Sequence, residues 1–173
     1  MRRAEKTWGN MQRANFLQLR YGPGAVIEPF LMRLFGEKNL KSVFWVSPWL
    51  THMDFRTATT KKLLRKLQTH RVNLILITRE PEPGSAHEEF VEDTKTLPTA
   101  SVFYMPMLHA KFYVATTRER RYALLGSANM YEWSNRSYEL GVVIEARGEG
   151  EVLVDKLEQL TMELRISQHT TSA

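Results

Sequence analysis

The fold is decided by residues 42–78, in which SVFWVS (42–47) and VNLILIT (72–78) enclose a longer, more polar stretch. Both short segments are continuous runs rich in β-branched and aromatic residues, which is typical of buried strands. Between them, residues 54–67 place apolar side chains at helical spacing with lysine and arginine on the other face, which predicts an amphipathic helix capped by Asp54. Strand, helix and strand in this order predict a parallel βαβ unit and therefore an α/β fold.

The remaining periodicities complete this expectation. They predict helices over 25–35, 85–97 and 148–165 and strands over 101–105, 110–116, 122–125 and 139–145. Short turns join the later strands, so we expect a mixed β-sheet flanked by helices. We expect one domain over residues 24–166, preceded by a basic N-terminal arm or helix (1–23) and followed by a C-terminal tail (167–173).

Composition narrows the class of protein. The formal net charge of +5 favours anionic partners, nucleic acid and anionic lipid surfaces among them. Cysteine is absent, which excludes disulfides, thiolate zinc sites and cysteine nucleophiles. The sequence has neither a stretch of signal-peptide character nor an apolar run of membrane-span length, so we expect a cytoplasmic protein.

Two short motifs and one acidic residue carry candidate chemistry. In LHAKFYV (108–114), His109 and Lys111 are two residues apart on a predicted strand, so their side chains leave the same face of the sheet. In LLGSANM (124–130), a turn of small residues lets backbone amides, Ser127 and Asn129 approach a phosphate. Glu139 begins the next strand, where a carboxylate could fix the tautomer of a histidine. The alternative is a tight turn, a surface acid and a histidine satisfied in the core.

In their order and spacing, HAK (109–111), GSAN (126–129) and Glu139 resemble the phospholipase D superfamily over about residues 25–165. The resemblance implies a mixed sheet between helices. It also implies a two-step reaction without metal or cofactor, in which one histidine attacks phosphorus to form a phosphohistidine and a second protonates the leaving alcohol. Lysine and asparagine of each motif hold the non-bridging oxygens. Such a division of labour needs one neutral and one protonated histidine.

The sequence departs from the family pattern at two points. Thr116 occupies the place of the family's motif aspartate, which is not expected to touch the phosphate, although its loss is the feature that favours an inactive member. Two-motif members pair their own halves, but this sequence contains only one H-x-K triplet. We therefore expect a homodimer that completes the active site, since twofold dimers are the commonest oligomers.

The substrate class rests on weaker signals. The resemblance favours a nuclease that hydrolyses nucleic-acid phosphodiester bonds, because small single-motif members are more often nucleases. Basic patches attract phosphate backbones, and aromatic rings stack on bases. Candidate nucleic-acid-binding residues are Arg118, Arg120, Arg121, Lys61, Lys62 and Trp133. Lys61 and Lys62 could equally belong to a solvated helix face. A phospholipid phosphodiesterase acting at a membrane, and a catalytically inactive nucleic-acid-binding dimer or subunit of a larger nuclease assembly, are the alternatives.

Overall fold

The predicted βαβ unit forms the centre of the structure. In the computed structural model, which describes residues 14–55, 58–131, 136–147, 152–167 and 169–173, strand β2 (Leu40–Val46) runs parallel to β5 (Asn73–Thr78). Helix α2 (Thr60–Thr69) connects them and buries Leu63, Leu64 and Leu67. Both strands are almost wholly buried, as their continuous apolar sequence predicted.

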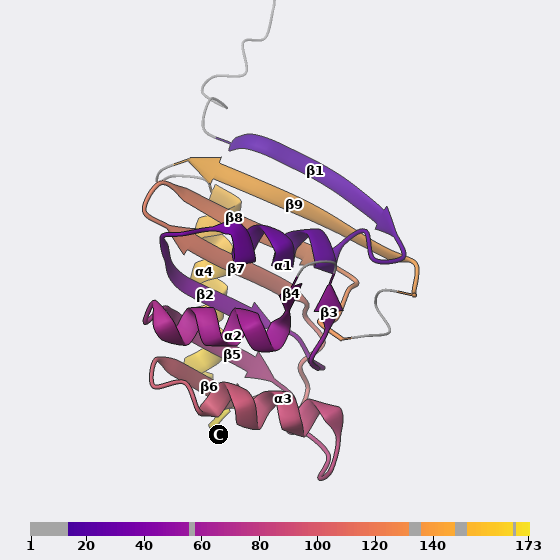
Figure 1. Ribbon diagram of the computed structural model, residues 1–173. Coiled ribbons are helices and arrows are strands. Elements are labelled where there is room, and N and C mark those ends of the chain that lie inside the picture. Colours follow the sequence, from indigo (N-terminus) through magenta and orange to yellow (C-terminus); the bar gives the residue numbers. More distant parts are fainter. Residues whose placement is uncertain (1–13, 56–57, 132–135, 148–151, 168) are drawn as a thin grey trace, which may run out of the picture.

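Eight strands form one mixed sheet in the order β1-β9-β8-β7-β2-β5-β6-β10 (Figure 1). Only the β2-β5 and β5-β6 pairs of this sheet are parallel, and the others are antiparallel. The remaining strands of the sheet are β1 (Ala14–Gly22), β6 (Ala100–Tyr104), β7 (Phe112–Thr117), β8 (Arg120–Gly126), β9 (Glu139–Arg147) and β10 (Thr171–Ser172). A separate two-stranded ribbon pairs β3 (Asp54–Phe55) with β4 (Ala58–Thr59).

Helices cover both faces of the sheet, which confirms the predicted α/β architecture. Helices α1 (Ile27–Gly36), α2 and α3 (Ala86–Lys95) lie on one face, and α4 (Val152–Ile166) lies on the other (Figure 1). The core accordingly has two parts. The larger contains Phe30, Leu63 and Phe90 from the first three helices, and the smaller contains Val154 and Leu157 from α4.

Helix α3 begins where the sequence predicted, but α2 is not capped by the predicted residue. Ser85 caps α3, its hydroxyl accepting a hydrogen bond from the backbone N–H of Glu88. For α2, the expected cap Asp54 lies in β3, and Thr59 caps the helix instead by accepting from the N–H of Lys62. The short ribbon occupies the residues that would otherwise have formed the first helical turn.

The structure corrects the expected ends of the domain. Residues 14–22, expected to belong to an arm or helix, form β1, which pairs antiparallel with β9 along its length. Within the expected tail, Thr171 and Ser172 form β10 and pair with β6. Residues 1–13 lie outside the described residues. No helix within the described residues is long and apolar enough to cross a membrane.

Candidate active site

The two predicted motifs meet at one end of the sheet, where β2, β5 and β8 end and β7 and β9 begin. His109 and Lys111 were expected on a strand. They lie instead in the segment just before β7. Pairing between β2 and β7 stops at Val46 and Phe112, because the N–H of Ser47 turns to β5 and Pro48 has no N–H to donate. The HAK segment is thereby released from the ladder.

Both HAK side chains are accessible. His109 is exposed, and Lys111 is half-buried with its ammonium donating a hydrogen bond to the His109 carbonyl oxygen at 3.0 Å. The carbonyl oxygen of Lys111 accepts a hydrogen bond from the Gly126 N–H at 3.3 Å. This contact brings the HAK segment directly beside the GSAN turn.

Gly126 is required at its position by the neighbouring strand. It stands opposite Gly141 across the β8-β9 pair. A Cβ on Gly126 would lie 2.8 Å from the Gly141 Cα and would overlap the Leu140 carbonyl oxygen. Beyond it, the N–H of Ser127 donates to that same oxygen at 2.9 Å. The close approach of backbones positions the turn, so the first residue of GSAN has a steric reason to be glycine.

The asparagine of the turn is oriented by the serine that directly follows β2. The Ser47 hydroxyl is fully buried and lies 3.1 Å from Asn129 Oδ1 and 3.0 Å from the Trp49 carbonyl oxygen. With its oxygen facing Ser47, the amide of Asn129 keeps its NH₂ group as a donor suited to an anion. Ser47 was not among the predicted site residues, because it lies 82 positions from Asn129 in the sequence.

Glu139 lies against the same turn. Its carboxylate accepts a hydrogen bond from the Ser127 hydroxyl, which in turn accepts from the N–H of Leu140 at 3.0 Å. The carboxylate therefore fixes Ser127. The expected hydrogen bond from a His109 imidazole to Glu139, within the chain or across a dimer, stays a prediction.

A cavity of about 480 Å³ opens beside the turn. Trp49, Thr51, Ser85, Ala86, His87, Asn129 and Tyr131 line it. Of the predicted catalytic residues, only Asn129 is among these described lining residues. Its lining combines aromatic side chains with polar ones, as expected of a site that holds an organic group next to a polar one.

Arg79 is a cation that the sequence analysis missed. It directly follows β5, its guanidinium Nε donates to the Leu108 carbonyl oxygen at 2.8 Å, and its guanidinium carbon lies 4.8 Å from the ring centroid of Trp49. Arg79 thus connects the residue before His109 with a wall of the cavity. Its place after a parallel strand at the carboxyl edge of the sheet was the available signal.

Two histidines near the cavity differ from His109 in being enclosed. Burial lowers the pKa of His87 to about 4, and its Nε2 lies 2.9 Å from the Thr78 hydroxyl. Burial and, to a lesser degree, the neighbouring Lys61 ammonium also lower the pKa of His52. Tyr113, which is buried beneath the turn, donates to the Ala128 carbonyl oxygen at 3.0 Å, and burial raises its pKa.

Three predicted nucleic-acid-binding arginines lie at the opposite end of the hairpin. Strand β7 runs away from Lys111, and at about 3.3 Å per residue Arg118 is roughly 23 Å distant along the chain. Arg118 is exposed, whereas Arg120 forms an ion pair with Glu145 at 3.1 Å. Arg121 is buried and forms ion pairs with Asp155 and Glu158 of α4. The structure therefore does not bring these arginines to the GSAN turn.

The other predicted nucleic-acid-binding residues are placed as follows. Lys61 and Lys62 are exposed in the first turn of α2, and Lys61 forms an ion pair with Glu89 at 2.7 Å. Trp133 lies outside the described residues. The first turn of α2 is at the same end of the sheet as the GSAN turn (Figure 1), so Lys62 is better placed than the hairpin arginines to meet a chain of phosphates.

These features define the candidate site: a histidine, a lysine, a serine and an asparagine lie on two adjoining segments at one end of a mixed sheet in an α/β protein. No protein-family model and no curated protein matches the sequence.

Solved structures do resemble it, and they have the phospholipase D fold. Nuc, a phospholipase D family member from Salmonella typhimurium, is similar at 14% identity and a TM-score of 0.66, covering 91% of this chain and 97% of its own. NucT from Helicobacter pylori is similar at 11% identity and a TM-score of 0.59, with 91% and 100% covered. Phosphatidylserine synthase from Haemophilus influenzae is similar at 17% identity and 0.61, covering 91% of this chain and 40% of its own. The fold is that of the phospholipase D superfamily, as the motifs predicted.

Proposed function

We propose that the chain is a metal-independent phosphodiesterase and, within that class, a nuclease. The observation that carries the proposal is the hydrogen bond that places GSAN beside HAK, within a phospholipase D-like fold. Together the two segments offer an accessible imidazole, an ammonium group and an oriented side-chain amide. These are the groups that phosphoryl transfer requires when no metal ion neutralises the phosphate.

His109 is the proposed nucleophile. In its neutral form one ring nitrogen attacks phosphorus, the bond from phosphorus to the leaving oxygen breaks, and a second, protonated histidine transfers its proton to that oxygen. Water, deprotonated by the second histidine, then cleaves the phosphohistidine and regenerates the free His109. Each step balances without an added cofactor.

Lys111, Asn129 and Arg79 are proposed to hold the non-bridging oxygens. The ammonium of Lys111 is bonded only to a backbone carbonyl oxygen at 3.0 Å among its described contacts, so rotation of a flexible chain frees it for phosphate. The amide of Asn129 is already turned by Ser47. The planar guanidinium of Arg79 can make paired hydrogen bonds to a phosphate.

A second copy of the chain is the proposed source of the second histidine. Support comes from the apolar residues exposed beside the site: Tyr138 is 87%, Tyr21 74% and Leu140 54% exposed. Tyr21 and Leu140 are paired across β1 and β9 and so share one face. Exposed aromatic and aliphatic side chains next to an incomplete site are what a twofold dimer would cover.

Nucleic acid is the proposed substrate because a net charge of +5 and the exposed cations Lys62 and Lys61 favour a polyanion. Trp133 and Arg118 stay proposed nucleic-acid contacts. The similarity to phosphatidylserine synthase favours the second candidate, a phospholipid substrate. The third, an inactive nucleic-acid-binding dimer, is favoured by Thr116 alone.

One assay separates these candidates. Single-stranded DNA, double-stranded DNA, RNA and a phosphatidyl lipid are each incubated with the chain in excess chelator, beside His109→Ala as the matched inactive variant. The proposal expects cleavage of at least one nucleic acid that His109→Ala abolishes. Cleavage of the lipid alone would select the second candidate. Binding of DNA without cleavage would select the third.

A further inference from the structure

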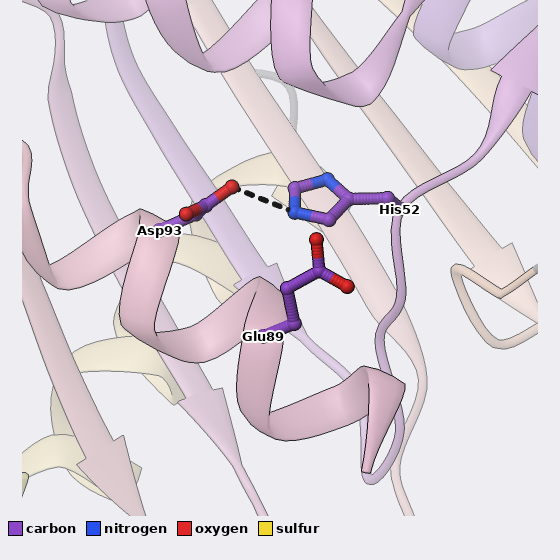
Figure 2. A group of neighbouring side chains, drawn as sticks. All are labelled: His52, Glu89 and Asp93. Atoms are coloured by element: carbon purple, nitrogen blue, oxygen red, sulfur yellow. Dashed lines mark ion pairs between the residues drawn. The ribbon is translucent and has the colours of Figure 1, made fainter. Parts of the chain in front are cut away.

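A histidine and two carboxylates lie together outside the proposed phosphodiester site. His52 belongs to the segment after β2, and Glu89 and Asp93 belong to α3. Their potential ligand atoms all lie within 4.8 Å of one another. Figure 2 shows both carboxylates on one side of α3, turned towards the His52 ring. We propose that these three residues bind a divalent transition-metal ion of the zinc or manganese type.

The donor set suits such an ion. Imidazole nitrogen and carboxylate oxygen are both ligand types that zinc takes, at about 2.0–2.2 Å, and three protein ligands leave a position open for water. Glu89 and Asp93 are four residues apart and therefore share one face of the helix. Bonds of that length would bring the donors to about 3.4 Å from one another in a tetrahedral site. Glu89 is the most exposed of the three, at 57% of its side chain, and can close that gap by giving up its ion pair with Lys61.

The ring of His52 is fixed with Nε2 towards the carboxylates. Its Nδ1 lies 3.2 Å from the Thr60 hydroxyl, and the ring centroid lies 5.2 Å from that of Phe90. Nε2 is buried and lies 2.9 Å from Asp93 Oδ2, but the direction of its N–H does not give a hydrogen bond. Around bound metals the second ring nitrogen of a histidine ligand is usually fixed by a hydrogen bond, and here the Thr60 hydroxyl is placed to accept it.

The charges of the cluster leave room for a cation. Two carboxylates one helical turn apart repel each other. The ammonium of Lys61, bonded to Glu89 at 2.7 Å, offsets the charge of Glu89 and more weakly that of Asp93. Among the described contacts, the Asp93 carboxylate directly meets only the His52 ring. Lys61 and the metal ion would compete for Glu89. Removing the Lys61 ammonium should therefore raise the affinity for the metal ion, an effect that a simple ion pair would not produce.

The bound ion would act as a clamp beside the proposed active site. It would join α3 to the segment that follows β2, and in that segment the N–H of Thr51 donates to the Met130 carbonyl oxygen at 2.8 Å. Met130 directly follows Asn129. The ion would therefore hold the loop that supports the GSAN turn without contacting phosphate. Neither His109 nor the proposed reaction is needed for this inference.

The test uses the intact chain, stripped with chelator and then titrated with zinc or manganese chloride alone. We expect calorimetric binding near one ion per chain and a rise in Tm of about 5–10 °C at a hundredfold excess over Kd. Asp93→Asn and His52→Gln should each lower the affinity at least tenfold, and Lys61→Gln should raise it. His70→Gln, which alters an exposed histidine at the far end of α2, is the matched control and should bind as the parent does.

Two results would overturn the proposal. One is the absence of any metal-dependent heat or Tm shift in the parent chain. The other is binding that persists unchanged in Asp93→Asn, a variant that should fold because that side chain is 45% exposed. Since neither measurement uses a substrate, failure of the metal site and failure of the phosphodiesterase proposal are told apart.

Discussion

Replacing Gly126 by alanine tests whether the GSAN turn depends on close approach of two strands. The new Cβ would overlap the carbonyl oxygen of Leu140 and lie 2.8 Å from the Cα of Gly141. Both obstacles are backbone atoms, so no side-chain rotation removes the overlap. Strands β8 and β9 must separate at this end.

The cost can be worked from the contacts that separation would break. Overpacking of this kind costs about 1–3 kcal/mol. The two hydrogen bonds between Ser127 and Leu140, at 2.9 and 3.0 Å, contribute roughly 1 kcal/mol each. Loss of glycine's freedom in the unfolded chain returns about 0.4–1 kcal/mol. We therefore expect the free energy of unfolding to fall by about 2–5 kcal/mol.

Urea unfolding followed by circular dichroism measures this loss, and nucleic-acid cleavage in chelator measures its effect on the site. Gly36→Ala is the matched control, because a Cβ there meets nothing within 4 Å and the residue ends α1. It should leave stability unchanged or raise it by about 0.5 kcal/mol. A Gly126→Ala chain as stable as Gly36→Ala, with cleavage intact, would refute the argument that backbone approach builds the turn.

Four further outcomes are expected. Ser47→Ala should lower kcat for cleavage about tenfold or more with a smaller change in KM, because the amide of Asn129 loses its orientation; equal kcat in both chains would contradict this. The pKa of His87 is about 4 in the folded chain and about 6.5 in the unfolded chain, so between these values the unfolded chain binds a proton that the folded chain does not. The free energy of unfolding should therefore drop by about 2 kcal/mol between pH 7 and 5. His87→Gln, measured in chelator, should lose that dependence. Cleavage itself should persist in excess chelator, and a strict need for magnesium would count against the mechanism. Glu139→Gln should keep the fold yet lower turnover, and unchanged turnover beside an inactive His109→Ala would leave Glu139 a structural role only.

The sequence predicted the centre of the fold well, because its signals there are local. The apolar runs of β2 and β5 and the serine cap of α3 each specify their element without help from distant residues. Strand β1 was not foreseen, and its polarity explains why. Leu17, Leu19 and Tyr21 are exposed, while the alternate residues Gln18 and Arg20 are half-buried. In this edge strand the apolar residues are exposed and the polar ones half-buried, so the alternation does not indicate which face is buried.

The site was predictable to the extent that its parts lie within motifs. The HAK and GSAN segments were identified from spacing, and the fold brings them into contact. Ser47 and Arg79 were missed because each follows one strand, β2 or β5, and contacts a residue that is distant in the sequence. Ser47 meets Asn129, and Arg79 meets the carbonyl oxygen of Leu108. The ion pair that buries Arg121 against α4 likewise has no signal in the sequence around it. Pairing between distant segments is a property of the topology and not of local pattern.

The departure at Thr116 has a structural counterpart that bears on catalysis. Its hydroxyl donates to Glu158 of α4 at 2.9 Å, and Arg121, its partner across the β7-β8 pair, forms ion pairs with Glu158 and with Asp155. The acidic groups that neutralise the buried arginine are thus supplied by the helix. An aspartate at position 116 would face Glu158 and add a like charge at a half-buried site beside Arg121, which already pairs with two carboxylates.

Thr116 also lies away from the chemistry. It is five residues beyond Lys111 along β7, roughly 17 Å at the usual rise of a strand. Its contacts hold α4 to the sheet, and the proposed reaction takes place at the strand's other end. Lys111 and Asn129, the residues proposed to hold the phosphate oxygens, have their contacts outside this network. The missing aspartate therefore changes how α4 is attached and weighs little against the proposed reaction.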